Sequence, residues 1–73
     1  MNEKTEMMAD MVKNLAVLLL EQNNELSMEQ ALSQVFNSDT YQKITDERTR
    51  LYFQSPRYVF SFLEDELKNG KLS

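Results

Sequence analysis

The hydrophobic residues of this sequence recur mostly at spacings of three and four, which is the period of an α-helix. The first such segment, residues 3–22, has an apolar face made of Met8, Met11, Val12, Leu15, Leu18 and Leu19. Further apolar residues widen this face until only a narrow polar strip remains: Met7, Ala16, Val17 and Leu20. A helix of this kind needs partners on more than one side. We therefore expect either a homodimer built on this helix or a helix that lies at the centre of its own chain.

A second helix is predicted over residues 27–37, after the polar stretch EQNNELS. Ser27 and Gln30 form a capping-box pattern, in which each side chain bonds the other residue's backbone N–H. Leu26 and Ala31 occupy the positions of a hydrophobic staple around that cap. The apolar face predicted for this helix consists of Met28, Ala31, Leu32, Val35 and Phe36.

A short third helix is predicted over residues 39–45, after a polar break at Asn37 and Ser38. Its apolar residues are Tyr41 and Ile44. The pattern of residues 46–53 fits either a continued helix or an ordered loop. In both cases we expect Leu51 and one ring of the pair Tyr52 and Phe53 to point into the core.

The last predicted helix covers residues 56–68. Ser55 suits its N-cap, and Pro56 suits the first helical position, where the missing N–H is not needed. Its expected apolar residues are Tyr58, Val59, Phe62, Leu63 and Leu67. Gly70 follows the last apolar residue and can adopt the left-handed conformation that ends many helices.

The composition supports a single all-α domain over residues 1–73, a small bundle of three to four helices, and the broad apolar first helix favours a homodimer. One Gly and one Pro are too few for the tight turns of a small β-protein. The longest apolar run, LAVLLL, is far shorter than the roughly 20 residues that span a bilayer. The absence of Cys and of a basic leader before this run is typical of a soluble cytoplasmic protein with no membrane contact.

The net charge of −4 argues against nucleic-acid binding by the field of the whole domain. Residues 43–57 nevertheless carry four basic residues against two acidic ones: Lys43, Arg48, Arg50 and Arg57 against Asp46 and Glu47. Tyrosine and phenylalanine residues interleave with these cations, so the segment has the composition to stack bases and contact phosphates. The same composition fits a helical core at whose edge Tyr and Arg side chains bury their apolar stems and keep their polar ends in water. We favour that interpretation.

Catalysis, cofactors and metals are not predicted. The chain has neither His nor Cys, the commonest general base and the best nucleophile. A single Gly excludes glycine-rich phosphate loops. The acidic run Glu64, Asp65 and Glu66 is consecutive on a helix, so its side chains diverge around the axis and are expected at a solvated helix end.

Three stretches between Leu26 and Leu63 resemble a group of small bacterial proteins of unknown biochemical function: LSMEQAL, SDTYQKITD and TRLYFQSPRYVFSFL. Proteins of this group are often encoded beside genes of the toxin and antitoxin type. The resemblance therefore implies a bacterial, cytoplasmic protein with an antitoxin-like or accessory binding role. It implies no catalytic residues.

These observations lead to the expectation of a small helical protein-protein interaction module that binds another protein. Five methionines would suit an adaptable interface. The candidate contacts lie around the Ser55–Pro56 corner: Tyr52, Gln54, Arg57 and Tyr58. The alternative is a small DNA-binding transcriptional regulator that uses Lys43, Arg48, Arg50 and Arg57.

Overall fold

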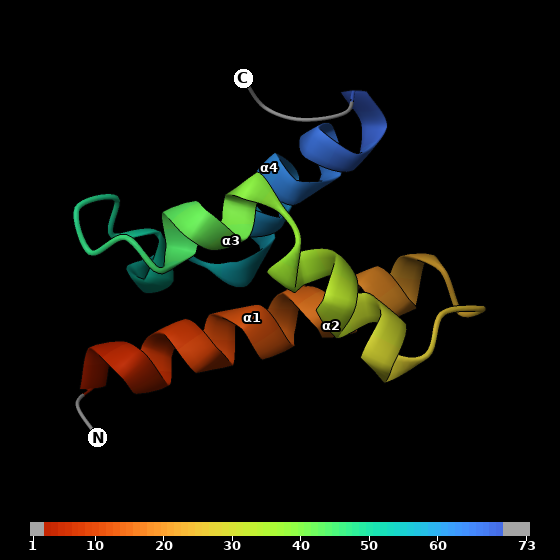
Figure 1. Cartoon of the computed structure of the whole chain (residues 1–73), viewed down its shortest axis with the longest axis horizontal. Helices are drawn as coiled ribbons and strands as arrows, with labels where there is room; N and C mark the ends of the chain where they lie inside the picture. Colours follow the sequence, from red (N-terminus) through yellow and green to blue (C-terminus); the bar gives the residue numbers. More distant parts are fainter. Residues whose placement is uncertain (1–2, 70–73) are drawn as a thin grey trace.

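The computed structural model describes residues 3–69 and contains four α-helices and one short 3₁₀ helix (Figure 1). The elements are α1 (Glu3–Gln22), α2 (Met28–Phe36), α3 (Asp39–Ile44), η1 (Leu51–Phe53) and α4 (Pro56–Asn69). No strand occurs within these residues, so the prediction of an all-α fold is confirmed. The predicted ranges differ from these bounds by at most one residue at either end. The expected cap at Gly70 lies outside the described residues.

Local hydrogen bonds explain why α2 and α4 begin where they do. The Ser27 hydroxyl accepts the Gln30 N–H at 3.1 Å, and the Gln30 side chain accepts the Ser27 N–H at 2.9 Å. This reciprocal pair is the predicted capping box. At the start of α4, the Ser55 hydroxyl accepts the Tyr58 N–H at 3.2 Å. Both helices therefore begin at residues whose side chains satisfy free backbone donors.

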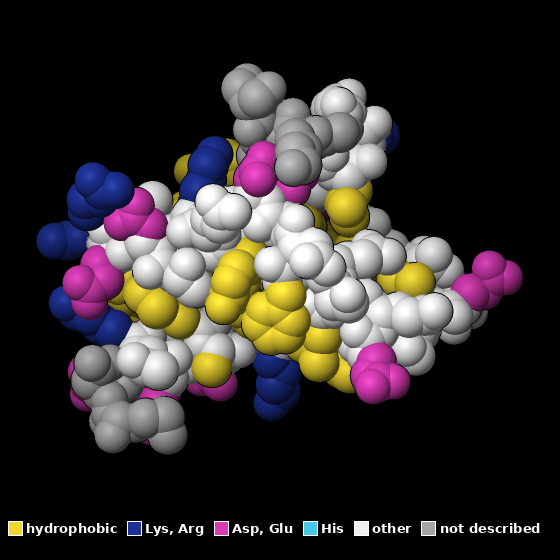
Figure 2. Space-filling view, in the orientation of Figure 1, with side chains coloured by type: hydrophobic (Ala, Val, Ile, Leu, Met, Phe, Trp, Pro, Cys, Tyr) yellow, Lys and Arg dark blue, Asp and Glu magenta, His cyan; other side chains and the backbone are white. Residues whose placement is uncertain are grey.

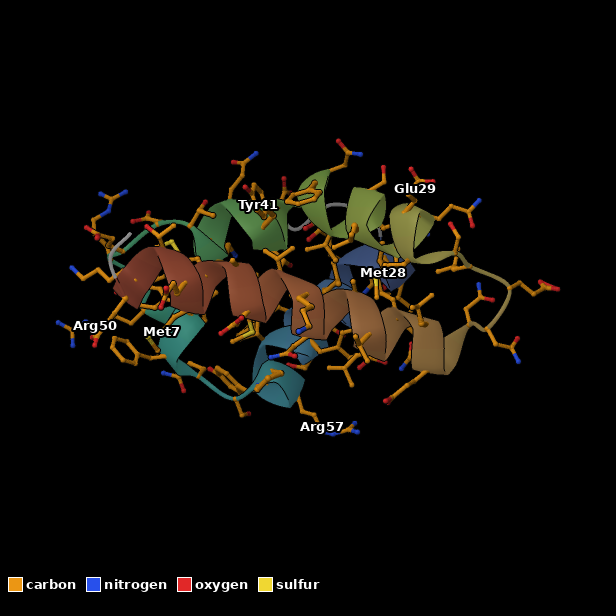
Figure 3. All side chains as sticks on the ribbon, turned by 90° about the horizontal axis from the view of Figure 1, so that it is seen from below. Met7, Met28, Glu29, Tyr41, Arg50 and Arg57 are labelled. Atoms are coloured by element: carbon orange, nitrogen blue, oxygen red, sulfur yellow. The ribbon has the colours of Figure 1, made fainter. Side chains whose placement is uncertain are left out.

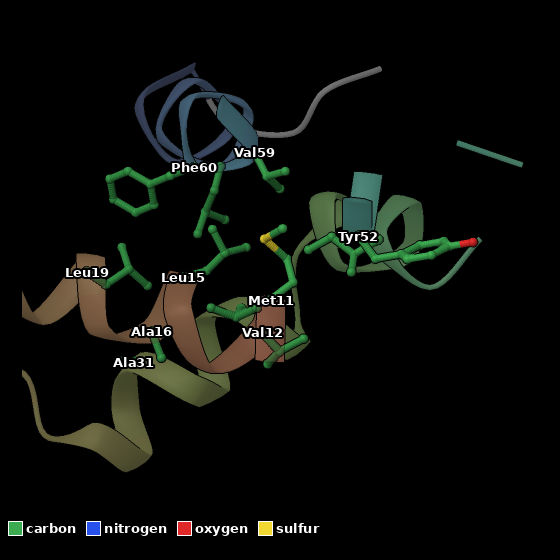
Figure 4. Close-up of a cluster of buried hydrophobic side chains, with 12 residues drawn as sticks. Met11, Val12, Leu15, Ala16, Leu19, Ala31, Tyr52, Val59 and Phe60 are labelled. Carbon is green, nitrogen blue, oxygen red and sulfur yellow. The ribbon is translucent and has the colours of Figure 1, made fainter. Parts of the chain in front are cut away.

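Helix α1 lies at the centre of the chain, in contact with α2, α3, α4 and η1 (Figure 1). The core consists of Met11, Val12, Leu15, Ala16, Leu19, Ala31, Val35, Ile44, Tyr52, Val59, Phe60 and Leu63. Figure 4 shows Ala16 of α1 against Ala31 of α2, where two small side chains allow the helices to approach closely. The broad apolar surface of α1 is thus largely covered within one chain, and its breadth alone gives no reason for a dimer.

The predicted apolar faces of α2 and α4 are only partly correct. In α2, Ala31 and Val35 are buried, whereas Met28 and Phe36 are exposed to 41% and 51%. In α4, the predicted core residues Tyr58 and Leu67 are largely exposed, and Phe60 is buried instead. Each helix is therefore rotated about its axis relative to the face that the sequence pattern predicts.

Residues 46–53 form an ordered loop that ends in η1. The hydroxyl of Thr49 lies within hydrogen-bond distance of the carbonyl oxygens of Lys43 and Asp46, which ties the loop back to the end of α3. Arg50 then adopts the left-handed conformation, with φ 54° and ψ 23°. In η1 the Tyr52 ring is buried and the Phe53 ring is 60% exposed, as expected for a pair of which one ring points inward.

Glu66 joins α4 to α3 and is only 6% exposed, whereas the sequence pattern predicts it in a solvated acidic run. Its carboxylate accepts the N–H of Asp39 at 2.7 Å and the N–H of Thr40 at 3.0 Å. The Thr40 hydroxyl donates a third hydrogen bond at 2.8 Å. The first donors of α3 are therefore satisfied by a residue far along the chain. The prediction for Glu66 is wrong because the local pattern does not show which helix end lies opposite.

Candidate functional site

A largely apolar groove of about 350 Å³ lies between α1, α2 and α3. We call it the apolar groove; its lining residues are Thr5, Met8, Ala9, Val12, Lys13, Leu32, Phe36, Tyr41 and Thr45. The Phe36 ring stands edge-on to the Tyr41 ring, with 5.2 Å between the ring centroids and 81° between the planes. Figure 2 shows hydrophobic side chains gathered on this face of the molecule, between α1 and the α2–α3 pair. A large, half-exposed aromatic ring therefore borders a concave apolar surface.

The sequence places Phe36 at this surface through two local features. Ala31 and Val35 face the core, so the residues that follow them by one position, Leu32 and Phe36, lie beside the core rather than in it. Only Asn37 and Ser38 separate α2 from α3, and the short turn brings Tyr41 back against Phe36. The exposed Met28 and Phe36 and the partly buried Leu32 between them lie at intervals of four residues, and we call these three residues the α2 stripe.

A second surface surrounds the entry to α4, and we call it the Pro56 corner, residues 53–58. Two hollows flank Pro56, with volumes of about 260 and 420 Å³. Both include Asn14 of α1, whereas the apolar groove lies on other residues of that helix. Figure 3 shows Tyr41, which lines the groove, on one side of α1 and Arg57 of the corner on the other. The chain therefore carries two separate candidate surfaces.

Three of the four predicted contact residues lie exposed at the Pro56 corner: Gln54, Arg57 and Tyr58. Tyr52 is the exception, because only 5% of it is exposed and it belongs to the core. Its neighbour Phe53 takes its place at the surface, with 4.9 Å between the centroids of the two rings. Tyr58 is 51% exposed and contacts Phe62 edge-to-face. The corner is therefore more aromatic at its surface than the prediction implied.

The four basic residues predicted for nucleic-acid contact do not form one patch. Figure 3 shows Arg50 at one end of the molecule and Arg57 beside α4. Arg57 lies 3.9 Å from a Glu21 carboxylate oxygen, and Arg48 bonds both carboxylate oxygens of Asp46. Because of these bonds from the Arg48 side chain and backbone, the pKa of the Asp46 carboxyl lies below its usual value. Acidic neighbours therefore offset two of the four cations.

A smaller basic area remains at the end of the molecule near η1. A hollow of about 540 Å³ is lined there by Lys4, Glu47, Arg48, Arg50, Tyr52 and Phe53. Lys4 pairs with Glu47 at 3.2 Å, and Figure 2 shows basic and acidic side chains intermixed at this end. The area combines cations with an exposed ring but has little net positive charge.

Residues 3–69 show neither a metal-binding cluster nor a membrane-spanning helix. Within this range no three Asp, Glu, His or Cys side chains are close enough together to hold a metal ion. None of the helices described there has both the length and the apolar character needed to cross a membrane. The helical pattern of the sequence does not reveal the apolar groove, because it assigns Leu32 and Phe36 to the core.

Comparison with known proteins finds no matching family model, no similar curated protein and no similar solved structure.

Proposed function

We propose that this protein is a small helical interaction module that acts by binding other protein chains, not by catalysis. The observation that carries this proposal is the apolar groove, where the half-exposed Phe36 ring borders a concave surface of apolar side chains. Such apolar surfaces favour the burial of a partner's apolar side chains, since burial removes both from water. An antitoxin-like or accessory role in a bacterial cytoplasm is one form of this function.

The Pro56 corner supports the same function on the other side of α1. Phe53 and Tyr58 are more than half exposed there, and aromatic residues are enriched where proteins bind one another. Gln54 and Arg57 add hydrogen-bond donors at the edge of the two hollows. A chain with two such surfaces can hold two partners at once, and we propose that it does so.

Affinity capture with matched surface variants tests this function. The tagged protein is incubated with lysate of its source organism, with and without nuclease, and bound proteins are identified by mass spectrometry. Phe36→Glu and Tyr58→Glu each introduce a charge on one surface, and Leu67→Glu is the control at a similarly exposed apolar position of α4. We expect a nuclease-resistant partner that the control retains and at least one surface variant loses. If both surface variants retain every protein that the wild type retains, the proposal is wrong.

DNA binding is the second candidate, and the specific observation in its favour is the hollow that Arg48, Arg50 and Phe53 line near η1. Cations beside an exposed ring can contact phosphates and stack on a base. A fluorescence assay with labelled DNA across a range of salt concentrations tests it, because phosphate contacts make affinity fall steeply as salt rises. Loss of binding in Arg50→Glu at low salt would support a regulator, whereas the absence of binding by the wild type would exclude it.

A further inference from the structure

The two ends of the α2 stripe differ in chemistry, and each suits the other in an antiparallel pair. Met28, Leu32 and Phe36 are spaced four residues apart, so the stripe is about 12 Å long at the usual rise of an α-helix. Its two ends are exposed to similar degrees, 41% at Met28 and 51% at Phe36. A flexible thioether at one end and an aromatic ring at the other make a favourable pair when they meet. An antiparallel copy of the stripe would bring these two ends together.

Two opposite charges that have no partner among residues 3–69 lie beside the α2 stripe, Lys13 on α1 and Glu29 on α2. Lys13 lines the apolar groove beside Phe36, and Glu29 directly follows Met28. Within residues 3–69 neither side chain makes an ion pair or a hydrogen bond. The distribution of charge along the stripe is therefore positive at one end and negative at the other.

We propose that the occupant of the apolar groove and the α2 stripe is a second copy of this chain. The two α2 helices lie antiparallel about a twofold axis near Leu32, so Met28 of each copy enters the groove beside Phe36 of the other. The same rotation places Glu29 of each copy opposite Lys13 of the other, which forms two equivalent ion pairs. A twofold axis requires this self-complementarity, since every contact in such an interface occurs twice with the roles exchanged. A helix from an unrelated protein would match this surface only if it carried both an acidic residue and a thioether at the corresponding positions.

This inference rests on the proposed function, because it assigns one of the two proposed binding surfaces to self-association. It leaves the Pro56 corner, on the other side of α1, as the surface for a different protein (Figure 3). The dimer would therefore present two identical corners and could hold two copies of that protein.

Charge reversal tests the two ion pairs in the purified full chain. Lys13→Glu places two acidic side chains opposite each other at both ends of the interface, and Glu29→Lys places two basic ones there. Like charges at an interface are strongly unfavourable, so we expect each variant to weaken the dimer by about tenfold or more.

An equimolar mixture of the two variants should regain wild-type association. At one end of the mixed pair, the introduced glutamate of one chain faces the introduced lysine of the other. At the opposite end, the unchanged Glu29 of the first chain faces the unchanged Lys13 of the second. Both ends of the mixed interface therefore carry opposite charges again.

Sedimentation equilibrium up to millimolar concentration measures the association, at an ionic strength of about 0.15 M to screen the repulsion between two chains of net charge −4. Lys68→Glu and Asp65→Lys are the control variants, since they introduce an acid or a base on α4, away from the α2 stripe. Both should associate as the wild type does. Circular dichroism checks that each variant retains its helices.

Three outcomes decide the inference. Recovery of the dimer in the mixture, together with weakened association of each variant alone, supports the antiparallel pairing. A monomeric wild type at every concentration overturns it, and so does a dimer that neither reversal weakens. The proposed function is tested separately from this inference. Tyr58→Glu measures the capture of another protein through the Pro56 corner, and that capture does not depend on the α2 stripe.

Discussion

Glu66→Gln should destabilise the protein much more than its place in an acidic run implies. The carboxylate accepts three hydrogen bonds from Asp39 and Thr40, at 2.7 to 3.0 Å, in a site from which water is largely excluded. A glutamine keeps one acceptor oxygen, but its NH₂ group then points at a backbone donor. A hydrogen bond to a charged group contributes about 1.5 to 3 kcal/mol, so we expect the free energy of unfolding to fall by about 2 kcal/mol.

The same substitution should remove a pH dependence. Burial alone would raise the pKa of Glu66, but the hydrogen bonds from Asp39 and Thr40 and the charge of Lys43 together bring it below its usual value. Because the folded pKa is lower than the unfolded one, ionised Glu66 stabilises the fold fully above about pH 4.5. That contribution is lost as the pH falls through the folded pKa. The difference between wild type and Glu66→Gln should therefore shrink in acid.

Urea denaturation at pH 7 and at about pH 3 measures both effects. Asp65→Asn is the matched control, since it removes the same charge from the adjacent, exposed position and should change stability by less than about 0.5 kcal/mol. Amide NMR signals of Asp39 and Thr40 should move most in Glu66→Gln, because their N–H groups lose a charged acceptor. A variant as stable as the control at pH 7, or a difference that does not shrink in acid, would refute the role assigned to Glu66.

Three further substitutions test other parts of the fold by urea denaturation. Leu15→Ala removes a fully buried side chain from the middle of α1, and the resulting cavity should lower stability by about 2 to 5 kcal/mol; a smaller loss would mean that α1 is not central. Ser55→Ala removes the hydroxyl that accepts the Tyr58 N–H and should cost about 1 kcal/mol, whereas Ser55→Asp should restore most of that loss. Arg50→Gly should raise stability by up to about 1 kcal/mol, because glycine adopts the left-handed conformation without the steric cost that Arg50 bears. A loss of stability would show that the Arg50 side chain makes a stabilising contact.

The helices could be predicted from the sequence because local features fix where each one begins. The capping box at Ser27 and the Ser55–Pro56 pair act within a few residues, and both are present in the structure. The period of the apolar residues determined the class of fold in the same way. These features depend only on residues that are close together in the sequence, so they can be derived without knowing how the helices pack.

The burial of individual residues could not be predicted as well, because it depends on what lies opposite each helix. Phe60 is buried and Tyr58 exposed, although both lie in the first half of α4, since only one of the two sides of the helix meets α1. Glu66 is buried for the same kind of reason, because the start of α3 offers it donors. Of the predicted contact residues, Tyr52 was misplaced on these grounds, while Gln54, Arg57 and Tyr58 are at the surface.

The candidate surfaces arise because such a short chain cannot cover all of its apolar side chains. Helix α1 contacts every other element, so the other helices direct apolar residues toward it. In helix α2, which is nine residues long, Ala31 and Val35 are fully buried, whereas Met28 and Phe36 remain exposed to 41% and 51%. Replacing either residue with a polar one should destabilise the isolated monomer less than the same change at the fully buried Val35, because about half of each side chain is exposed. In the proposed antiparallel pair, a second chain would cover the exposed part of both side chains.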